Sequence, residues 1–460
     1  MAEIAPFKGL RYDTGKVGAL GRVFAPPYDV IDGAMRERLI AGSAHNIARI
    51  TRSPEAEKEA EPERYAAAAK LLAGWRASGA LVEDAAPAFY AYEQEFTLAG
   101  SAQTAEGSKS GPADSSANRQ PPAAYRRLGL VAGLRLVDFG KGVHPHEETL
   151  SGPKADRRLL LEKTRTHMGQ IFGLYPDEPG AVNSAIRQAV GSRKPDLEDR
   201  DGDGIVHRLW MIADEAACGE LVRLMADKDI FIADGHHRYE VALQYSREHP
   251  ELPRAKYVMA TLVALSDPGL VVLPTHRLVH DLPGFKLENL EAALGADFRL
   301  QRFPFKKDDR DSRLASCLAH LAEEREAGRT AFVLYGGGAR FTLVTLENAK
   351  AMAAAEPSHG EAWRTLDVAV LHTLILDRIL GIDRAKLAAK TNLDYLKDNG
   401  QAIGEAIAEI DAGRAQCVFV MNPTDVAQVA AVASTGEKMP QKSTFFHPKL
   451  YTGMVLMPLE

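Results

Sequence analysis

The stretch of the chain with the most evident chemical potential reads FIADGHHRYE and starts at Phe231. An apolar run ends at Asp234, and the residues after the two histidines place apolar side chains at helical spacing. The pattern therefore predicts a strand, a tight turn and a helix N-terminus. Gly235 permits the sharp turn and a close approach to the backbone. A helix N-terminus presents backbone N–H groups and the positive end of the helix dipole.

The basic side chains of this turn indicate what it binds. Cationic groups at a helix N-terminus oppose the dipole, and an anionic ligand would offset that cost. We therefore predict that His236, His237 and Arg238 bind a phosphate or pyrophosphate group. Asp234 either caps the helix or acts on a substrate hydroxyl or a metal. The alternative is an ordinary Asx-type turn with exposed histidines. Adjacent histidines project differently, which argues against a metal site that His236 and His237 share.

A second polar stretch, VHPHEETLSGPKADRR, runs from Val143 to Arg158 and is interrupted by prolines and glycine. Glu147 is the candidate general base toward a hydroxyl group. His146 and Arg157 are candidate substrate or phosphate ligands, and the His-Pro-His-Glu sequence also fits a divalent cation. Taken in isolation, the stretch equally fits a solvated charged loop.

A third polar stretch, KMPQKSTFFHPKLYTG, closes the chain. Its lysines and hydroxyl groups suit phosphate contacts, and the candidates are Lys442, Ser443, Thr444 and Lys449. Phe445 and Phe446 are expected in the core, with a stacking surface for a base as the alternative. A milder signal is APPYDVI, in which two prolines fix an extended entry before Asp29.

Strands and helices that could position these groups are interspersed without a strict βαβ rhythm. This predicts a mixed α/β (α+β) fold, with a mixed sheet flanked by helices. Residues 98–124 are rich in small and polar residues, which predicts a disordered surface loop or a linker. The flanks of that segment read as two adjacent strands. Ser358–Glu361 has capping-box spacing and predicts the start of one long buried helix that ends near Leu380.

The composition excludes several classes of protein. The 460 residues carry a net charge of −6, whereas a sequence-independent grip on nucleic acid would require a basic excess. The three cysteines are far apart and predict neither a disulfide framework nor a metal site. The N-terminus lacks a secretory signal, and no apolar run reaches membrane-spanning length. We expect a soluble cytoplasmic protein with no nucleic-acid or membrane partner.

Several motifs together resemble a known family. APPYDVI, PHEET, ADGHHRYE, LPTHRLV and MPQKSTFFHPKLYTG occur in this order, and the chain is identified as a member of domain-of-unknown-function family 1015. The resemblance covers nearly the whole chain. The family name itself implies no activity.

The DGHHR turn also resembles the ParB/sulfiredoxin superfamily, which implies a core of that type. Sulfiredoxins have a nucleophilic cysteine where this chain has His236, so sulfiredoxin chemistry is excluded. ParB-type members carry a DNA-binding helix-turn-helix, which we do not find. The free serine kinase branch is the most similar in this motif. It implies that Asp234, His236, His237 and Arg238 handle the transferred phosphate, with Glu147 as our candidate for the glutamate base.

The leading hypothesis is a phosphotransferase that converts a small hydroxylated metabolite, specifically free L-serine, into its phosphate ester. Asp29 and Arg157 would recognise the amino and carboxylate groups of serine. ADP, ATP or pyrophosphate would be the donor, and Mg²⁺ is expected with each of them, although the sequence names no metal ligand. The alternatives are a nucleotide-gated binding protein of ParB type and a phosphatase or nucleotidase.

These stretches are expected to lie in two lobes. Residues 1–285 would form an N-terminal lobe with the DGHHR turn. Residues 286–460 would form a C-terminal α/β lobe that contributes the MPQKSTFFHPK loop. The sequence does not define the oligomeric state.

Overall fold

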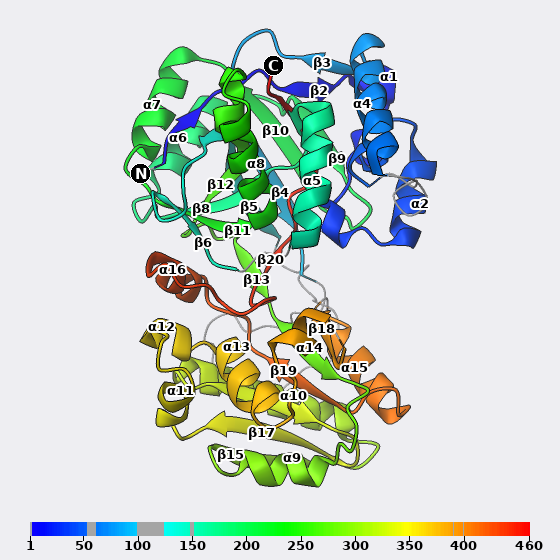
Figure 1. Cartoon of the computed structure of the whole chain (residues 1–460), viewed down its shortest axis with the longest axis vertical. Helices are drawn as coiled ribbons and strands as arrows, with labels where there is room; N and C mark the ends of the chain where they lie inside the picture. The colour runs from blue at the N-terminus through cyan, green and yellow to red at the C-terminus, as the bar shows by residue number, and fades with distance from the viewer. Residues whose placement is uncertain (1, 53–60, 99–123, 148–150, 390, 399) are drawn as a thin grey trace, which may run out of the picture. The chain divides into compact units, whose positions relative to one another are not determined.

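The computed structural model describes residues 2–52, 61–98, 124–147, 151–389, 391–398 and 400–460 (Figure 1). The chain forms two compact units. Of the described residues, unit 1 contains those up to residue 97, from 124 to 271 and from 446 to 460, and unit 2 contains those from 272 to 445. Strands β13 (Val271–Leu273) and β20 (Phe445–His447) lie where the chain passes from one unit to the other.

Unit 1 contains a nine-stranded mixed sheet, in the order β6-β11-β8-β12-β5-β4-β10-β9 with β1 beside β5. The pairs β6/β11 and β8/β12 are parallel, and the other pairs are antiparallel. The strands are β1 (Ile4–Ala5), β4 (Phe89–Phe96), β5 (Tyr125–Arg135), β6 (Val143–Pro145), β8 (Ile171–Tyr175), β9 (Leu197–Arg200), β10 (Val206–Ile212), β11 (Ile230–Asp234) and β12 (Tyr257–Ala264). The mixed α/β fold class predicted from the sequence is confirmed.

Helices flank this sheet because their apolar side chains recur at helical spacing. Val182 and Ile186 on α6, Leu221 on α7, and Tyr239 and Ala242 on α8 join one core cluster with the strands. The helices of unit 1 are α1 (Thr14–Val17), α2 (Gly33–Gly42), α3 (Ala48–Thr51), α4 (Glu61–Ala77), α5 (Ser151–Thr164), α6 (Ala181–Val190), α7 (Glu215–Met225) and α8 (His236–Glu248), with 3-10 turns η1 (Leu20–Arg22), η2 (Tyr28–Val30) and η4 (Pro253–Lys256). Two short sheets pair β2 (Leu10–Tyr12) with β3 (Leu81–Glu83) and β7 (Thr166–His167) with β21 (Met457–Pro458).

The two strands predicted around the low-complexity segment are antiparallel neighbours, from Phe96 opposite Tyr125 to Tyr90 opposite Val131. Their predicted pairing is confirmed. Of the predicted loop at 98–124, residues 99–123 lie outside the described residues.

Unit 2 contains a six-stranded antiparallel sheet in the order β15-β17-β16-β19-β14-β18. Both faces are buried, since Phe332 and Leu334 of β16 join one core cluster and Val333 and Tyr335 join another. The strands are β14 (Thr275–Val279), β15 (Phe298–Pro304), β16 (Ala331–Tyr335), β17 (Arg340–Leu346), β18 (Leu393–Lys397) and β19 (Cys417–Met421). The helices are α9 (Leu287–Leu294), α10 (Arg310–Glu326), α11 (Lys350–Ala355), α12 (Glu361–Arg364), α13 (Asp367–Val370), η5 (Leu371–Asp377, a π-helix), α14 (Arg384–Ala389), α15 (Ala402–Asp411) and α16 (Val426–Ser434).

The long helix predicted from Ser358 to about Leu380 is wrong in two respects. The first helix begins after Gly360, whose N–H donates to the carboxylate of Glu437 at 2.9 Å, so Ser358 is not its N-cap. The segment is then divided into α12, α13 and the π-helix η5. Burial was predicted correctly, because Leu366, Val370 and Leu374 lie in the core.

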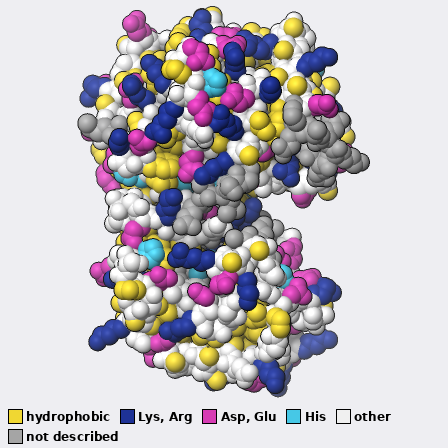
Figure 2. Space-filling model, in the orientation of Figure 1, with side chains coloured by type: hydrophobic (Ala, Val, Ile, Leu, Met, Phe, Trp, Pro, Cys, Tyr) yellow, Lys and Arg dark blue, Asp and Glu magenta, His cyan; other side chains and the backbone are white. Residues whose placement is uncertain are grey.

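The surface of the molecule mixes both signs of charge. Lys and Arg side chains are interspersed with Asp and Glu on the face shown in Figure 2. Within the described residues, no helix combines the length and apolar character needed to cross a bilayer.

Candidate functional site

The turn between β11 and α8 has the strand–turn–helix structure predicted from the sequence. Strand β11 ends at Asp234, Gly235 is the N-cap with φ 96°, and α8 begins at His236. A Cβ atom on Gly235 would lie 3.1 Å from both Arg238 Nη2 and Ile171 Cδ1. Glycine therefore supplies the left-handed backbone and leaves room for the Arg238 side chain.

The carboxylate of Asp234 joins two cations from distant parts of unit 1. Arg238 Nη2 donates to Oδ2 at 2.7 Å, and Lys449 Nζ donates to Oδ1 at 2.5 Å. Burial alone would raise the pKa of Asp234, but the charges of Lys449 and Arg238 outweigh burial and hold the pKa far below its ordinary value. Asp234 is therefore an ionised counterion for the basic turn, so the turn does not need an external anion to balance Arg238.

A chain of hydrogen bonds orients Arg238. Its Nη1 donates to the carbonyl of Gln170 at 2.5 Å, and Gln170 Nε2 donates to the carbonyl of Tyr451 at 2.9 Å. Thr261 Oγ1 donates to Gln170 Oε1 at 2.7 Å. Nothing in the sequence around Gln170 or Thr261 distinguished them as parts of a site, whereas Tyr451 belongs to the predicted KMPQKSTFFHPKLYTG stretch and takes part through its backbone carbonyl.

His146 and Glu147 reach the same edge of the sheet as the turn. Strand β6 runs parallel to β11, with Pro145 opposite Ile232, so the residues that follow both strands lie together. The backbone N–H of His146 donates to His236 Nε2 at 3.2 Å, and His146 Nδ1 donates to the carbonyl of Ile232 at 2.5 Å. Burial lowers the pKa of His146.

These two histidines hold strand ends together. The Nε2 atom of His236 accepts the hydrogen bond from the backbone N–H of His146. Both side chains are buried. Arg238 and Lys449 are the two cations that contact the carboxylate of Asp234 directly.

His237 is half-buried, and its charged neighbours come from several parts of unit 1. Burial lowers its pKa, and the charges that act on it belong to Glu240, Lys154, Glu147 and Asp29. Lys154 forms an ion pair with Glu240 on α8. The carboxylates of Glu147 and Asp29, both predicted from the sequence, are thus among the charges that act on this imidazole.

Arg157 contacts the aromatic ring that precedes Asp29. Its guanidinium carbon lies 3.9 Å from the centre of the Tyr28 ring, Nε donates to Asp156 at 2.6 Å, and Nη2 donates to the carbonyl of Thr51 at 3.0 Å. Burial raises the pKa of Tyr28, against the opposing charges of Arg157 and Arg238. Tyr28 was not predicted as a site residue, although its position in APPYDVI was a possible signal.

Unit 1 thus contains ten of the predicted site residues: Asp29, His146, Glu147, Arg157, Asp234, Gly235, His236, His237, Arg238 and Lys449. Lys442, Ser443 and Thr444 belong to unit 2. There the carbonyl of Lys442 accepts from Arg277 Nη2 at 3.1 Å, and that of Ser443 accepts from Thr424 at 2.7 Å. Phe446 is buried against Phe172, with ring centres 5.6 Å apart, so its predicted place in the core is confirmed.

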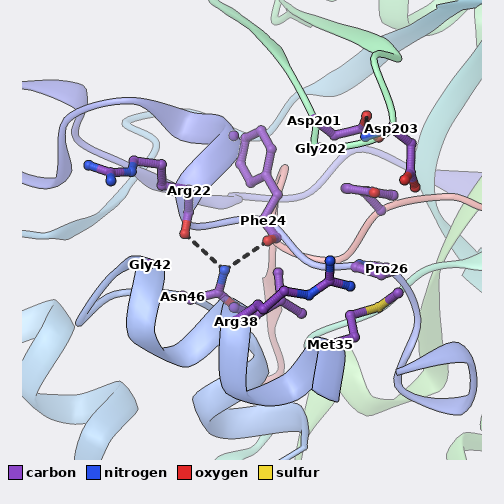
Figure 3. Close-up of a pocket in the computed structure, with 13 residues that line it drawn as sticks. Arg22, Phe24, Pro26, Met35, Arg38, Gly42, Asn46, Asp201, Gly202 and Asp203 are labelled. Carbon is purple, nitrogen blue, oxygen red and sulfur yellow. Dashed lines mark hydrogen bonds between the residues drawn. The ribbon is translucent and has the colours of Figure 1, made fainter. Parts of the chain in front are cut away.

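A cavity of about 290 Å³ lies beside the segment that precedes Tyr28 (Figure 3). It is bounded by the segment from Gly21 to Pro26, by α2, by the turn from Asp201 to Asp203 and by Tyr451. Two hydrogen bonds fix one wall, because Asn46 Nδ2 donates to the carbonyls of Arg22 at 2.8 Å and Phe24 at 3.0 Å.

Metal-ligand geometry among the described residues occurs away from the turn, at Glu162, Glu248 and His249. Arg158 already donates to both carboxylates, at 3.2 Å and 3.0 Å. Glu248 is the last residue of α8, which is roughly 18 Å along the helix axis from the turn. This group therefore does not supply the Mg²⁺ expected for phosphoryl transfer.

Comparison with solved structures finds distant similarities. A conserved hypothetical protein from Pyrococcus furiosus is 14% identical, with a TM-score of 0.30 over 67% of this chain and 89% of that one. Free serine kinase in complex with AMP is 12% identical, with a TM-score of 0.30 over 66% and 83%. C-terminally truncated SbnI from Staphylococcus aureus is 9% identical, with a TM-score of 0.33 over 69% and 84%.

No curated protein matches the chain. A family model described as a protein of unknown function (DUF1015) matches residues 4–107 and 116–369, which is most of the sequence. The resemblance seen in the sequence motifs is confirmed, and the chain belongs to the DUF1015 family.

Proposed function

We propose that this protein is a phosphotransferase that phosphorylates a small hydroxylated metabolite, with free L-serine as the specific acceptor. One observation carries the proposal. At the start of α8, Asp234 pairs with Arg238 and with the distant Lys449, and the charges of Glu147 and Asp29 act on the half-buried His237. Phosphoryl transfer requires this combination of charge neutralisation, positioning and proton removal.

Arg238 and Lys449 are the groups that would neutralise the transferred phosphate. Asp234 holds both in place, at 2.7 Å and 2.5 Å, before any ligand arrives. Preorganised charges of this kind stabilise a transition state without reorganisation during the reaction. The resemblance of the DGHHR turn to that of free serine kinases supports the same assignment.

The base must be a carboxylate other than Asp234, because a carboxylate with a strongly lowered pKa is a poor proton acceptor. We assign this role to Glu147, whose charge acts on both His146 and His237. The serine hydroxyl oxygen would attack the terminal phosphorus of the donor. The bond from phosphorus to the leaving oxygen would break, and the hydroxyl proton would pass to Glu147.

Asp29 would bind the ammonium group of serine. The guanidinium of Arg157 already has Asp156 and the Thr51 carbonyl as partners, so its support of Tyr28 is the contribution that the geometry favours over a direct contact with the carboxylate of serine. Mg²⁺ bound with the donor would neutralise phosphate oxygens. The role of Lys442, Ser443 and Thr444 as phosphate contacts stays a prediction from the sequence.

An assay for O-phosphoserine with ADP, ATP and pyrophosphate in turn tests the proposal. We expect product with at least one donor, and His237→Ala should lower its rate of formation. His249→Ala, just beyond the other end of α8, is the matched control and should retain activity. Absence of product with every donor at millimolar serine would rule out serine. Phosphate release that does not depend on serine would identify a phosphatase instead.

A further inference from the structure

The cavity beside α2 differs in character from the charged turn. Its walls include Phe24, Pro26, Met35 and Leu39, so most of its lining is apolar (Figure 3). The lining also includes charged residues, among them Arg38 and Asp203, which are both exposed. At about 290 Å³ the cavity lies near the lower end of the volumes of small-molecule sites, which begin at roughly 300 Å³.

Hydrogen bonds on two sides make the cavity a defined feature of unit 1. Gly21 N–H donates to Asp199 at 2.7 Å, and a Cβ at Gly21 would lie only 2.4 Å from the carbonyl of Arg200. Next to Arg200 in the chain, one oxygen of Asp201 accepts from the N–H groups of Asp203 and Ile205, each at 2.9 Å. The wall segments are therefore held in place without a ligand.

A buried network supports the Asp201 side of the cavity. The second oxygen of Asp201 lies 2.9 Å from His207 Nε2, and His207 Nδ1 lies 2.7 Å from the hydroxyl of Tyr92. The ring of Tyr451, which lines the cavity, packs against His207 with ring centres 4.6 Å apart. Asp201 and Tyr451 thus form a polar part of the lining, which His207 and Tyr92 support from behind.

The cavity adjoins the Asp234 site through two shared segments. Pro26 lines the cavity, and two residues later Tyr28 is within the electrostatic reach of Arg238. Tyr451 lines the cavity, and its carbonyl accepts from Gln170, the residue whose own carbonyl binds Arg238. Backbone hydrogen bonds of 3.1 Å and 2.8 Å between Ala25 and Thr452 join the two segments.

These features select one chemical class of ligand. An apolar space suits a flat heteroaromatic ring, a carboxylate at its edge suits hydroxyl or amino donors, and a nearby arginine suits phosphate. Pyrophosphate has no apolar part, and free serine has too little apolar surface to fill the cavity. We propose that this cavity binds the base and ribose of the phosphoryl donor, so that the donor is a nucleoside polyphosphate. The inference rests on the proposed function for the identity of the reaction.

Calorimetric titration of the full-length protein tests the assignment. ADP, GDP, CDP and UDP are titrated separately, beside the four free nucleosides and inorganic pyrophosphate. Leu39→Trp fills the cavity, and Ala41→Trp on the exposed side of the same helix is the matched control. We expect Leu39→Trp to weaken binding of the preferred nucleotide and nucleoside by at least about tenfold and to leave pyrophosphate binding unchanged. Ala41→Trp should change none of these affinities.

Asp203→Asn provides a second variant that leaves the volume of the cavity unchanged. It should weaken the binding of the nucleoside and of the nucleotide and leave the affinity for pyrophosphate unchanged. Binding of pyrophosphate with no measurable preference for any nucleotide would overturn the inference and leave the proposed phosphate site standing. Nucleoside binding that Leu39→Trp abolishes, in a protein that does not bind pyrophosphate, would support the cavity and contradict the phosphate site. An equal loss of pyrophosphate and nucleotide affinity in Leu39→Trp would also overturn the inference.

Discussion

Two arginines that share a sequence context, Arg238 in ADGHHRYE and Arg277 in LPTHRLV, have different surroundings. Arg238 donates to the carboxylate of Asp234, and its side chain keeps 16% of its exposure. Arg277 is 1% exposed and donates to the carbonyls of Thr275 and Lys442 and to Nε2 of His372. The first is a charge that a ligand can approach, whereas the second joins three parts of unit 2. A His-Arg motif alone therefore does not distinguish a site from an internal support.

The distinction between Arg238 and Arg277 requires that the Asp234 region take part in the reaction. A variant of the proposed base tests this requirement. Glu147→Gln removes the proposed base and keeps the size of the side chain. We expect the rate constant kcat for O-phosphoserine formation to fall by about a hundredfold or more, within the range for loss of general base catalysis. Thermal stability should change little. Steady-state kinetics with calorimetry on the same samples measure both.

Glu220→Gln is the matched control for that variant, because Glu220 lies on the exposed face of α7 and pairs with Arg223. It should retain the wild-type kcat. A Glu147→Gln protein with unchanged kcat would reassign the base, and Asp29→Asn would then be the next variant to measure.

The internal role of Arg277 predicts the next effect. Arg277→Met leaves the Thr275 and Lys442 carbonyls and the His372 imidazole without this donor, and each buried unsatisfied group costs about 1–3 kcal/mol. We expect the free energy of unfolding of unit 2 to fall by on the order of 3 kcal/mol, with pyrophosphate affinity unchanged. Differential scanning calorimetry measures the change in stability, and calorimetric titration measures the affinity for pyrophosphate. Loss of pyrophosphate binding at intact stability would show that Arg277 is part of a ligand site.

Arg238→Met is the reciprocal variant. Pyrophosphate affinity should fall by about tenfold or more, because one charge-assisted bond to phosphate is lost. Stability should fall less than in Arg277→Met, since Asp234 keeps its bond to Lys449. Equal destabilisation by the two variants would remove the distinction between the two arginines.

Local signals predicted the local parts of this molecule. An apolar run, a glycine and a helical repeat lie within a few residues of Asp234, so β11, the turn and α8 were predictable. The ion pair between Asp234 and Lys449 joins residues 215 positions apart, and its geometry depends on the fold of the whole unit. The π-helix η5 in the segment predicted as one helix likewise depends on packing, since a hydrophobic repeat does not encode where helical bonding changes.

The smallest effect that we predict concerns a property of His372. Burial and then the charge of Arg277 hold the pKa of His372 well below its ordinary value of 6.5. As pH falls below 6.5, the unfolded chain binds a proton at this histidine that the folded chain does not, so stability decreases with falling pH. The slope contributed by one histidine is at most about 1.4 kcal/mol per pH unit.

His372→Gln keeps an acceptor for Arg277 Nε and removes the titration. The stability of this variant should therefore depend less on pH between 6.5 and 5 than that of the wild type. Calorimetry of the full-length proteins across that range measures the difference. Parallel pH profiles of the two proteins would show that His372 is protonated equally in the folded and unfolded states. In that case Arg277 would need an anionic partner, and its surroundings would resemble those of Arg238 more closely than the geometry indicates.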